Sequence, residues 1–284
     1  MRSLARDAYE AYLERRLSSS DVPRHVAVVQ DGNRRHALSK GEEPTKGHEE
    51  GAETTEAVLD WAYEVGVEEM TLYAFSTENF ERDDDELEEL FDIIADKLDE
   101  LADSEKIHDR RVRVRGVGDL SRLPERVRDA LTRVENATEE YRQHRLNVAL
   151  AYGGRDELVE TARRIARDVE EGRLSPESVD ASAVSSRLRL GSDIDLVVRT
   201  GGEHRLSNFV PWQARGAGAE VYFCDTYWPS FERHEFLKAV ESYSGDSDGE
   251  GDRDDGGRRT VASEERRRTP VPSMTKPEVE EPAD

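Results

Sequence analysis

Residues 25–36 read His-Val-Ala-Val-Val-Gln-Asp-Gly-Asn-Arg-Arg-His, an apolar run followed by a polar turn and three basic side chains. The run at 26–29 predicts a buried strand. Asp31 follows that strand, and open α/β sheets place their ligand sites at the carboxyl ends of strands. A carboxylate can ligate a hard cation such as Mg2+, and Arg35 can hold a phosphate through two parallel hydrogen bonds. The stretch predicts a metal-assisted anion site; the simpler interpretation is a strand, a turn capped by Asp31 and a solvated basic patch.

A second stretch has the same layout as the first. Residues 195–209 read Asp-Leu-Val-Val-Arg-Thr-Gly-Gly-Glu-His-Arg-Leu-Ser-Asn-Phe. An apolar strand ends at Arg199, a glycine turn follows, and Arg205 and Ser207 come next. Arginines and small hydroxyls suit a second anion, although in so acidic a protein the two arginines could instead be surface ion-pair partners.

The composition limits the partners that the protein can have. The 284 residues carry a net charge of −23, with 64 acidic and 41 basic residues, and only six of the basic residues are lysines. A nucleic-acid-binding protein would show a basic face, so no nucleic-acid partner is expected. An acidic surface poor in lysine favours a protein that stays soluble in high salt, and we expect a salt-loving source. The single cysteine excludes an internal disulfide. No apolar run could span a membrane and no signal peptide is visible, which predicts a cytoplasmic protein, possibly peripheral at the membrane surface.

Periodicity and turn residues predict an α/β fold with six strands and intervening helices. The strands are expected at 25–30, 70–75, 112–117, 146–152, 196–199 and 220–224, with 112–117 near an edge. Helices are expected at 3–17, 47–65, 84–101, 124–141, 156–171, 180–190 and 231–243, and a mobile loop at 37–45. The helix at 156–171 is expected to turn Leu158, Ala162, Ile165 and Val169 inward. This order predicts a mainly parallel six-stranded sheet flanked by helices on both faces. The expected organisation is an N-terminal helix in 1–22, one domain over 23–243, and a disordered acidic tail over 244–284.

Five stretches resemble the cis-prenyltransferase family, and together they span residues 25 to about 240. They are 25–35, Gly-His-Glu-Glu-Gly at 47–51, Thr-Leu-Tyr-Ala-Phe-Ser-Thr-Glu-Asn at 71–79, Ala-Tyr-Gly-Gly-Arg at 151–155, and 195–209 continued by 219–223 and Trp228-Pro229. Members of this family add isopentenyl diphosphate units to an allylic diphosphate, and each new double bond is cis. The resemblance implies that 23–243 is a catalytic domain with a hydrophobic tunnel for the growing chain. It also implies Mg2+ dependence, a homodimer, and a polycis-polyprenyl diphosphate product, released to the membrane, that serves as a lipid carrier precursor for glycosylation.

The resemblance also implies roles for individual residues. Asp31 would be a catalytic Mg2+ ligand beside the allylic diphosphate, and Glu220 a second acidic contact with the metal. Asn79 would be catalytic by positioning the condensing ends. The remaining residues would bind the substrates: Gly32, Asn33, Arg34, Arg35 and His48 at the allylic diphosphate, Arg199, Arg205 and Ser207 at isopentenyl diphosphate, and Ser76, Thr77, Glu78, Phe80 and Arg82 around the condensing ends. His48 could instead be a residue of the helix start without a ligand role, Glu78 could simply be solvated, and Glu220 could only mark the solvent end of its strand.

Several features differ from the family pattern or leave alternatives open. The family usually has Gly-Arg-Trp after Asp-Gly-Asn, where this chain has Arg34, Arg35 and His36. The chain also looks two residues longer before Glu220, which leaves the placement of Glu220 open. Ala74 is small where the family's tunnel runs and is a candidate product-length determinant. A salt-loving archaeal source would imply geranylgeranyl diphosphate, or else farnesyl diphosphate, as primer. One alternative is a non-catalytic partner subunit of a heteromeric prenyltransferase. Another is an all-helical trans-prenyl synthase, because Asp84-Asp-Glu superficially resembles the acidic motif of that family.

Overall fold

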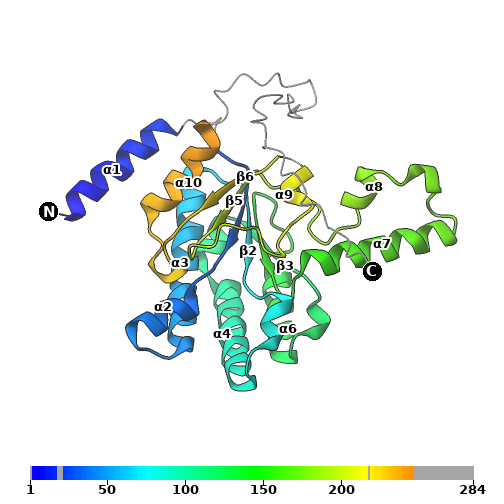
Figure 1. Ribbon diagram of the computed structural model, residues 1–284, viewed down its shortest axis with the longest axis horizontal. Helices are drawn as coiled ribbons and strands as arrows, with labels where there is room; N and C mark the ends of the chain where they lie inside the picture. Colours follow the sequence, from blue (N-terminus) through cyan, green and yellow to red (C-terminus); the bar gives the residue numbers. More distant parts are fainter. Residues whose placement is uncertain (1, 18–21, 217, 246–284) are drawn as a thin grey trace, which may run out of the picture. The chain divides into compact units, whose positions relative to one another are not determined.

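Six parallel strands form one sheet at the centre of the protein (Figure 1). The computed structural model describes residues 2–17, 22–216 and 218–245. The strands are β1 (His25–Val29), β2 (Glu69–Tyr73), β3 (Val112–Val117), β4 (His144–Ala149), β5 (Leu196–Arg199) and β6 (Glu220–Phe223). They lie in the order β3-β4-β2-β1-β5-β6, and each neighbouring pair is parallel. The predicted sheet is confirmed, with β3 at an edge, and it excludes the all-helical alternative.

Helices connect the strands and cover the sheet. The α-helices are α1 (Arg2–Arg16), α2 (Asn33–Lys40), α3 (Pro44–Val65), α4 (Asp84–Asp103), α5 (Glu105–Asp109), α6 (Glu125–Ala137), α7 (Gly154–Glu170), α8 (Ala181–Ser185), α9 (Gln213–Gly216) and α10 (Arg233–Gly245). Single 3-10 turns are η1 (Thr77–Glu81), η2 (Leu120–Arg122), η3 (Pro176–Ser178) and η4 (Trp228–Ser230). Each predicted helix has a counterpart in the structure, but the one expected at 180–190 ends at Ser185, and the others differ by a few residues at their ends.

The two faces of the sheet are covered differently. Because strand side chains alternate, Val26 and Val28 of β1 face one side and Ala27 and Val29 face the other. The first side packs against buried residues of α3, α4, α6 and α10. The second packs against apolar residues within 190–214, most of them outside the helices. The thick helical side therefore supplies the volume in which a long apolar ligand could lie.

The expected mobile loop at 37–45 is wrong for its first half, which is helical. Helix α2 continues to Lys40, ends at Gly41 with φ +76°, and is followed after two residues by α3, which starts at Pro44. The segment was hard to recognise because it is short, polar and buries only His36 and Ala37. The predicted turn at 30–33 thus leads directly into a helix whose N-terminus lies beside Asp31.

Helices α7 and α8 extend from the sheet as an arm (Figure 1). The predicted inward stripe of α7 is wrong: the buried residues are Gly154, Glu157 and Thr161, whereas Leu158, Ile165 and Val169 are half-buried and Ala162 and Val159 are exposed. Glu157 is buried because Tyr152 and the backbone N–H of Arg189 donate hydrogen bonds to it. The apolar stripe of α7 is therefore only partly covered by the described residues.

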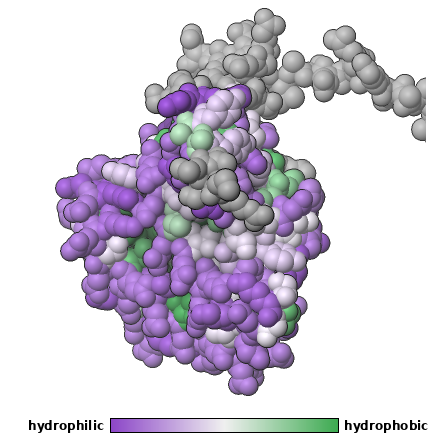
Figure 2. Space-filling model, turned by 90° about the vertical axis from the view of Figure 1, so that its left-hand side faces the viewer, coloured by the Kyte–Doolittle hydropathy of each residue, from purple (hydrophilic) through white to green (hydrophobic). Residues whose placement is uncertain are grey.

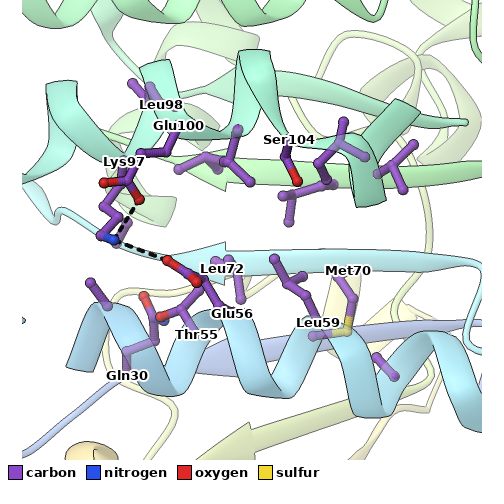
Figure 3. Close-up of a pocket in the computed structure, with 18 of the residues that line it drawn as sticks. Gln30, Thr55, Glu56, Leu59, Met70, Leu72, Lys97, Leu98, Glu100 and Ser104 are labelled. Atoms are coloured by element: carbon purple, nitrogen blue, oxygen red, sulfur yellow. Dashed lines mark hydrogen bonds and ion pairs between the residues drawn. The ribbon is translucent and has the colours of Figure 1, made fainter. Parts of the chain in front are cut away.

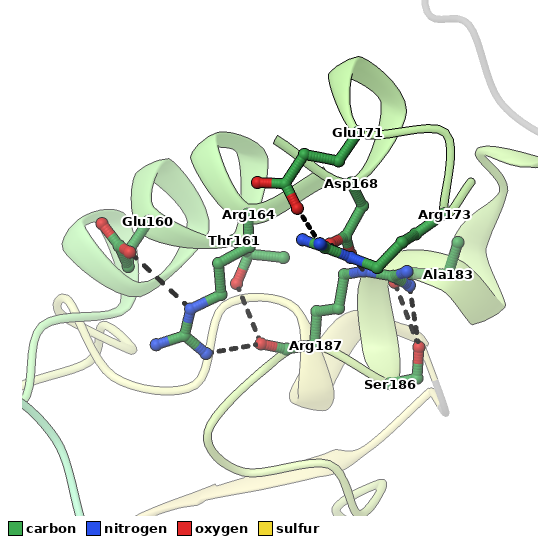
Figure 4. Close-up of polar contacts among 9 residues, drawn as sticks. All are labelled: Glu160, Thr161, Arg164, Asp168, Glu171, Arg173, Ala183, Ser186 and Arg187. Carbon is green, nitrogen blue, oxygen red and sulfur yellow. Dashed lines mark hydrogen bonds and ion pairs between the residues drawn. The ribbon is translucent and has the colours of Figure 1, made fainter. Parts of the chain in front are cut away.

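An ion-pair cluster fixes the end of this arm (Figure 4). Asp168 of α7 accepts hydrogen bonds from Arg173 at 2.8 Å and from Arg187, after α8, at 2.8 Å. These two arginines hold the pKa of Asp168 below its usual value. Arg164 of α7 donates to the backbone carbonyl of Arg187 at 3.2 Å. The cluster thus ties the segment after α8 to the end of α7.

The surface matches the charge of the sequence. Figure 2 shows a face dominated by hydrophilic residues, with small separated hydrophobic spots. None of the helices in the described ranges has the length and apolar character of a membrane span. Helix α1 lies against α10 through the buried Leu13 and through the ion pairs Arg6–Glu232 and Arg16–Glu241. The disordered tail was expected from residue 244, but residues 244 and 245 belong to α10, and the rest of the tail lies outside the described residues.

Candidate active site

Asp31 lies between two arginines that come from distant parts of the chain. Arg35, in the first turn of α2, donates to Oδ1 at 2.9 Å, and Arg199, the last residue of β5, donates to Oδ2 at 2.9 Å. The backbone of Asp31 is held as well: Thr200 Oγ1 accepts its N–H at 3.1 Å and donates to its carbonyl at 2.9 Å. The carboxyl ends of β1 and β5 are neighbours in the sheet, so this meeting follows from the topology. We call Arg35, Asp31 and Arg199 the Asp31 clamp.

Arg199 is the buried member of the clamp. Its side chain is only 5% exposed, and it also donates to the carbonyl oxygen of Arg205 at 2.5 Å. Its Nε donates to no described residue. A buried guanidinium with a free donor can bind an oxyanion without losing an existing partner. The Arg205 side chain is 69% exposed instead and pairs with Glu203 at 3.2 Å.

The N-terminus of α2 lies directly beside the clamp. Gly32 caps this helix with φ +103°, and a Cβ there would lie 2.6 Å from Tyr227 Cδ1, so only glycine fits. The first N–H groups of a helix point outward and favour anions. Asn33 donates to the Gln30 carbonyl at 3.2 Å, while its buried Oδ1 accepts no hydrogen bond from the described residues. This turn thus combines an anion-binding backbone with an unused polar atom.

A second cluster brings together Arg34, His48 and Arg82. Arg82 NH1 lies 3.1 Å from His48 Nε2 and 2.8 Å from Glu86 Oε1, and Arg34 NH1 lies 3.5 Å from Glu86 Oε2. Burial, and then the charges of Arg82 and Arg34, lower the pKa of His48 to about 4. His48 is therefore neutral at neutral pH, and the structure brings together Arg34 and His48, predicted at the allylic diphosphate, with Arg82, predicted around the condensing ends.

The turn at 76–80 is positioned mainly by its own hydrogen bonds. Asn79 Oδ1 accepts the backbone N–H of Ser76 at 2.8 Å and so completes a capping box. Glu78 accepts a hydrogen bond from Asn208 Nδ2 at 2.9 Å. Burial alone would raise the pKa of Glu78, but hydrogen bonds from Asn208 and its neighbours lower it. Thr77 also donates to Glu78, at 3.3 Å. The turn thus meets the loop that carries Ser207, whose backbone is left-handed with φ +60°.

Two predicted residues lie away from these clusters. Phe80 packs edge-on against Phe75, with ring centroids 4.9 Å apart, and belongs to the core. Glu220 is the first residue of β6 and pairs in register with Leu196 at the start of β5. It therefore lies at the amino ends of the strands, roughly 16 Å along the strand direction from Asp31. Among the described residues, no three His, Cys, Asp or Glu side chains are grouped to hold a metal.

An apolar cavity of about 430 Å3 begins at this site and runs between α3 and α4 (Figure 3). Its near end is lined by Gln30, Asn33 and His48, and its far end by Arg110 and His144. The walls between them come mainly from aliphatic residues: Leu59 of α3, Leu90, Ile94, Leu98 and Leu101 of α4, and Met70, Leu72 and Ala74 at β2. The apolar stripe of α4 thus serves as core and as cavity wall together. Polar groups occur at the rim, where Lys97 of α4 reaches Glu56 of α3 at 3.0 Å.

Several residues of the site could not be assigned from sequence. Thr200 holds the Asp31 backbone, and Glu203 lies within 4.0 Å of Arg35 and 3.2 Å of Arg205. Trp228 donates through its backbone N–H to the Asp31 carbonyl at 3.1 Å and through Nε1 to the Gly51 carbonyl at 2.7 Å. The sequence showed Thr200 and Glu203 inside the second stretch and Trp228 in a matching dipeptide, but only their neighbours in space reveal what they hold.

The chain belongs to the cis-prenyltransferase family, in which undecaprenyl diphosphate synthases are grouped. The family model described as "Putative undecaprenyl diphosphate synthase" matches residues 29–249. The chain is 52% identical over 247 residues to the tritrans,polycis-undecaprenyl-diphosphate synthase (geranylgeranyl-diphosphate specific) of Halobacterium salinarum, covering 86% of this chain and 82% of that protein. It is 49% identical over 243 residues to the protein of the same description from Haloarcula marismortui, covering 85% and 79%.

A solved structure supports the same assignment. Lavandulyl diphosphate synthase from Lavandula x intermedia, in complex with dimethylallyl diphosphate, superposes with a TM-score of 0.74 at 33% identity, covering 79% of this chain and 96% of that one. The expected family and fold class are confirmed, and the chain is a prenyltransferase.

Proposed function

We propose that the protein elongates geranylgeranyl diphosphate with isopentenyl diphosphate to a long polycis-polyprenyl diphosphate of the undecaprenyl type. The observation that carries this proposal is that Asp31, the centre of the clamp, lies in the chain between Gln30 and Asn33, which line one end of the apolar cavity. A charged site suits a diphosphate, and a cavity lined by aliphatic side chains suits a prenyl chain. The choice of geranylgeranyl diphosphate rests on the descriptions of the relatives from Halobacterium salinarum and Haloarcula marismortui.

The chemistry places opposite charges at the two ends of the breaking bond. The allylic C–O bond breaks and negative charge collects on the departing diphosphate. A C–C bond forms to isopentenyl diphosphate, which then loses one proton as the new double bond forms, and the departing diphosphate can accept that proton. Fixed positive groups at the diphosphate lower this barrier. The N-terminus of α2, with Arg34 and Arg35, supplies them for the allylic substrate, and Arg199 supplies one for isopentenyl diphosphate. The aliphatic cavity excludes water from the allylic carbon.

Asp31 is suited to hold Mg2+. Its side chain is 29% exposed, and each carboxylate oxygen accepts one hydrogen bond from an arginine, which leaves a lone pair free on each. Mg2+ is commonly held by one or two carboxylates together with substrate phosphates, so one acidic ligand suffices. When bound, Mg2+ would neutralise charge on the departing diphosphate. The second predicted ligand, Glu220, lies at the amino ends of the strands, away from Asp31 of the same chain.

A homodimer would cover the apolar surface that this protomer leaves open. The stripe of Leu158, Ile165 and Val169 on α7 is only half-buried, and Val159 beside it is exposed. All four residues of the edge strand β6 are also half-buried. Uncovered apolar stripes of this kind are typical of subunit interfaces. We expect a two-fold dimer in solution, with the apolar product leaving toward a membrane surface.

The decisive experiment supplies purified protein with Mg2+, labelled isopentenyl diphosphate and equal amounts of geranylgeranyl and farnesyl diphosphate. We expect elongation of geranylgeranyl diphosphate in preference, with mass spectrometry giving the number of added units. The reaction is run in high salt and in dilute buffer, because the acidic surface predicts better activity in high salt. Failure to elongate either primer under both conditions would support the non-catalytic partner subunit instead.

Replacing Ala74 with leucine should shorten the product. Ala74 lines the cavity just beyond β2, so a larger side chain fills space that the growing chain needs. We expect the longest product to lose several isoprene units while the rate of the first addition changes less than about threefold, because the diphosphate site is untouched. Reversed-phase chromatography of the dephosphorylated products measures this. Unchanged chain length would remove Ala74 as a length determinant.

A further inference from the structure

Two carboxylates that face arginines of the first turn of α2 are arranged alike. In the Asp31 clamp, Asp31 receives Arg35 on one oxygen and Arg199 on the other. In the second cluster, Glu86 receives Arg82 on Oε1 at 2.8 Å and faces Arg34 with Oε2 at 3.5 Å. Arg34 and Arg35 are consecutive in the first turn of α2, so neighbouring side chains of one helix reach two different carboxylates. Each group of two arginines and one carboxylate keeps one excess positive charge.

Glu86 differs from the other acids at the start of its helix. Asp84, Asp85 and Glu86 form the acidic first turn of α4, where the helix dipole favours negative charge. Asp84 and Asp85 are exposed, as that general role requires. The side chain of Glu86 is only 12% exposed and bridges residues of α2 and of the segment after η1. A partly buried carboxylate between two cations fixes their positions more strongly than an exposed one does.

The contact between Arg82 and His48 determines the form of the imidazole. A guanidinium can only donate hydrogen bonds, so the His48 Nε2 that lies 3.1 Å from Arg82 NH1 must be the acceptor. A neutral imidazole that accepts at Nε2 carries its proton on Nδ1. Burial and the two nearby arginines keep this ring neutral. His48 also lines the near end of the cavity, beside Asn33.

We propose that Glu86 is a positioning residue for the allylic diphosphate: it holds Arg34 and Arg82 in place and, through Arg82, fixes His48 as an Nδ1–H donor. This role rests on the proposed function, since it assigns the second cluster to the allylic substrate of the same reaction. Glu86 itself is an anion and does not contact the diphosphate. Its contribution is to keep two flexible cationic side chains oriented before the substrate arrives, which reduces the entropy lost on binding.

The test compares Glu86→Gln with Asp85→Asn, which removes an exposed acid from the same helical turn. Glu86→Gln should raise KM for the allylic primer about tenfold, leave KM for isopentenyl diphosphate within about twofold, and weaken binding of inorganic pyrophosphate in calorimetry. Asp85→Asn should change none of these. Thermal unfolding monitored by circular dichroism confirms that both variants are folded. Equal increases in the two KM values, or a fall in kcat alone, would overturn the positioning role.

Nuclear magnetic resonance tests the same proposal without turnover. Nitrogen-15 shifts of the His48 ring, assigned with a His48→Gln variant, should show an unprotonated Nε2 and a protonated Nδ1 at pH 7 in the wild type. In Glu86→Gln the ring should show a mixture of tautomers. An Nε2–H ring or an imidazolium in the wild type contradicts the proposal. If the wild type elongates no primer, the proposed function fails, whereas pyrophosphate binding and the ring tautomer still decide the role of Glu86.

Discussion

Replacing Asp31 with alanine should reduce turnover by roughly a thousandfold or more while the protein stays folded. The substitution removes the carboxylate that we assign to Mg2+ and leaves Arg35 and Arg199 without the anion between them. The fold should survive because the Asp31 backbone remains bonded to Thr200 and Trp228. Steady-state incorporation of labelled isopentenyl diphosphate measures the loss, and circular dichroism measures the fold.

Asp225→Asn is the matched control for Asp31→Ala. Asp225 belongs to the loop that follows β6, its side chain is 91% exposed, and its nearest ionic partner is His204 at 3.5 Å. Its substitution should leave turnover nearly unchanged. If Asp31→Ala kept more than a tenth of wild-type activity, the assignment of the metal to this carboxylate would be wrong.

Replacing Arg199 with lysine should lower kcat/KM for isopentenyl diphosphate by about a hundredfold. Lysine keeps the charge but cannot reach both Asp31 and the Arg205 carbonyl, because it lacks the planar fork of the guanidinium. Losing one partner of a buried charged pair typically costs about 2–5 kcal/mol. We also expect a lower melting temperature, since the clamp joins the ends of β1 and β5. Kinetics at saturating primer separate the effect on isopentenyl diphosphate from any effect on the allylic site.

Arg205→Ala provides the contrast, because the sequence assigns both arginines to the same diphosphate. The structure ranks them: Arg199 is buried in the clamp, whereas the Arg205 side chain is exposed and pairs with Glu203. We therefore expect a smaller loss for Arg205→Ala than for Arg199→Lys. The reverse order would mean that the loop at 200–208 rearranges when isopentenyl diphosphate binds.

The strands and their parallel arrangement could be predicted because each strand is a short apolar run between turn residues. Val26–Val29 and Leu196–Val198 carry this signal without interruption, and intervening helices leave little choice but parallel pairing. The meeting of Asp31 with Arg199 then follows, since both end neighbouring strands. The sequence alone does not specify the order of the strands in the sheet, in which β1 lies between β2 and β5.

The remaining features depend on neighbours that no local pattern reveals. Helix α2 is too short and too polar to show apolar residues at helical spacing. The sequence therefore predicts a turn where this helix begins and a loop over the rest of it. Glu86 looked like an ordinary acid at a helix start until Arg34 and Arg82 were seen on either side. Glu220 belongs to one of the stretches that resemble the family, but the strand register places it at the amino ends of the strands, whereas Asp31 lies at their carboxyl ends. The apolar residues of α7 recur at helical spacing, yet they do not form the buried face of the helix.

The wall that β2 contributes to the cavity has a consequence for how product size can evolve. Met70, Leu72 and Ala74 all line the cavity, and alternate residues along a strand are spaced roughly 7 Å apart. Along this row, Ala74 lies nearest to the diphosphate site and Met70 lies farthest from it. We expect a side chain larger than the present one at any of these positions to stop elongation at that depth. Single substitutions would then change the length of the lipid in steps, while the residues that bind the diphosphates stay the same.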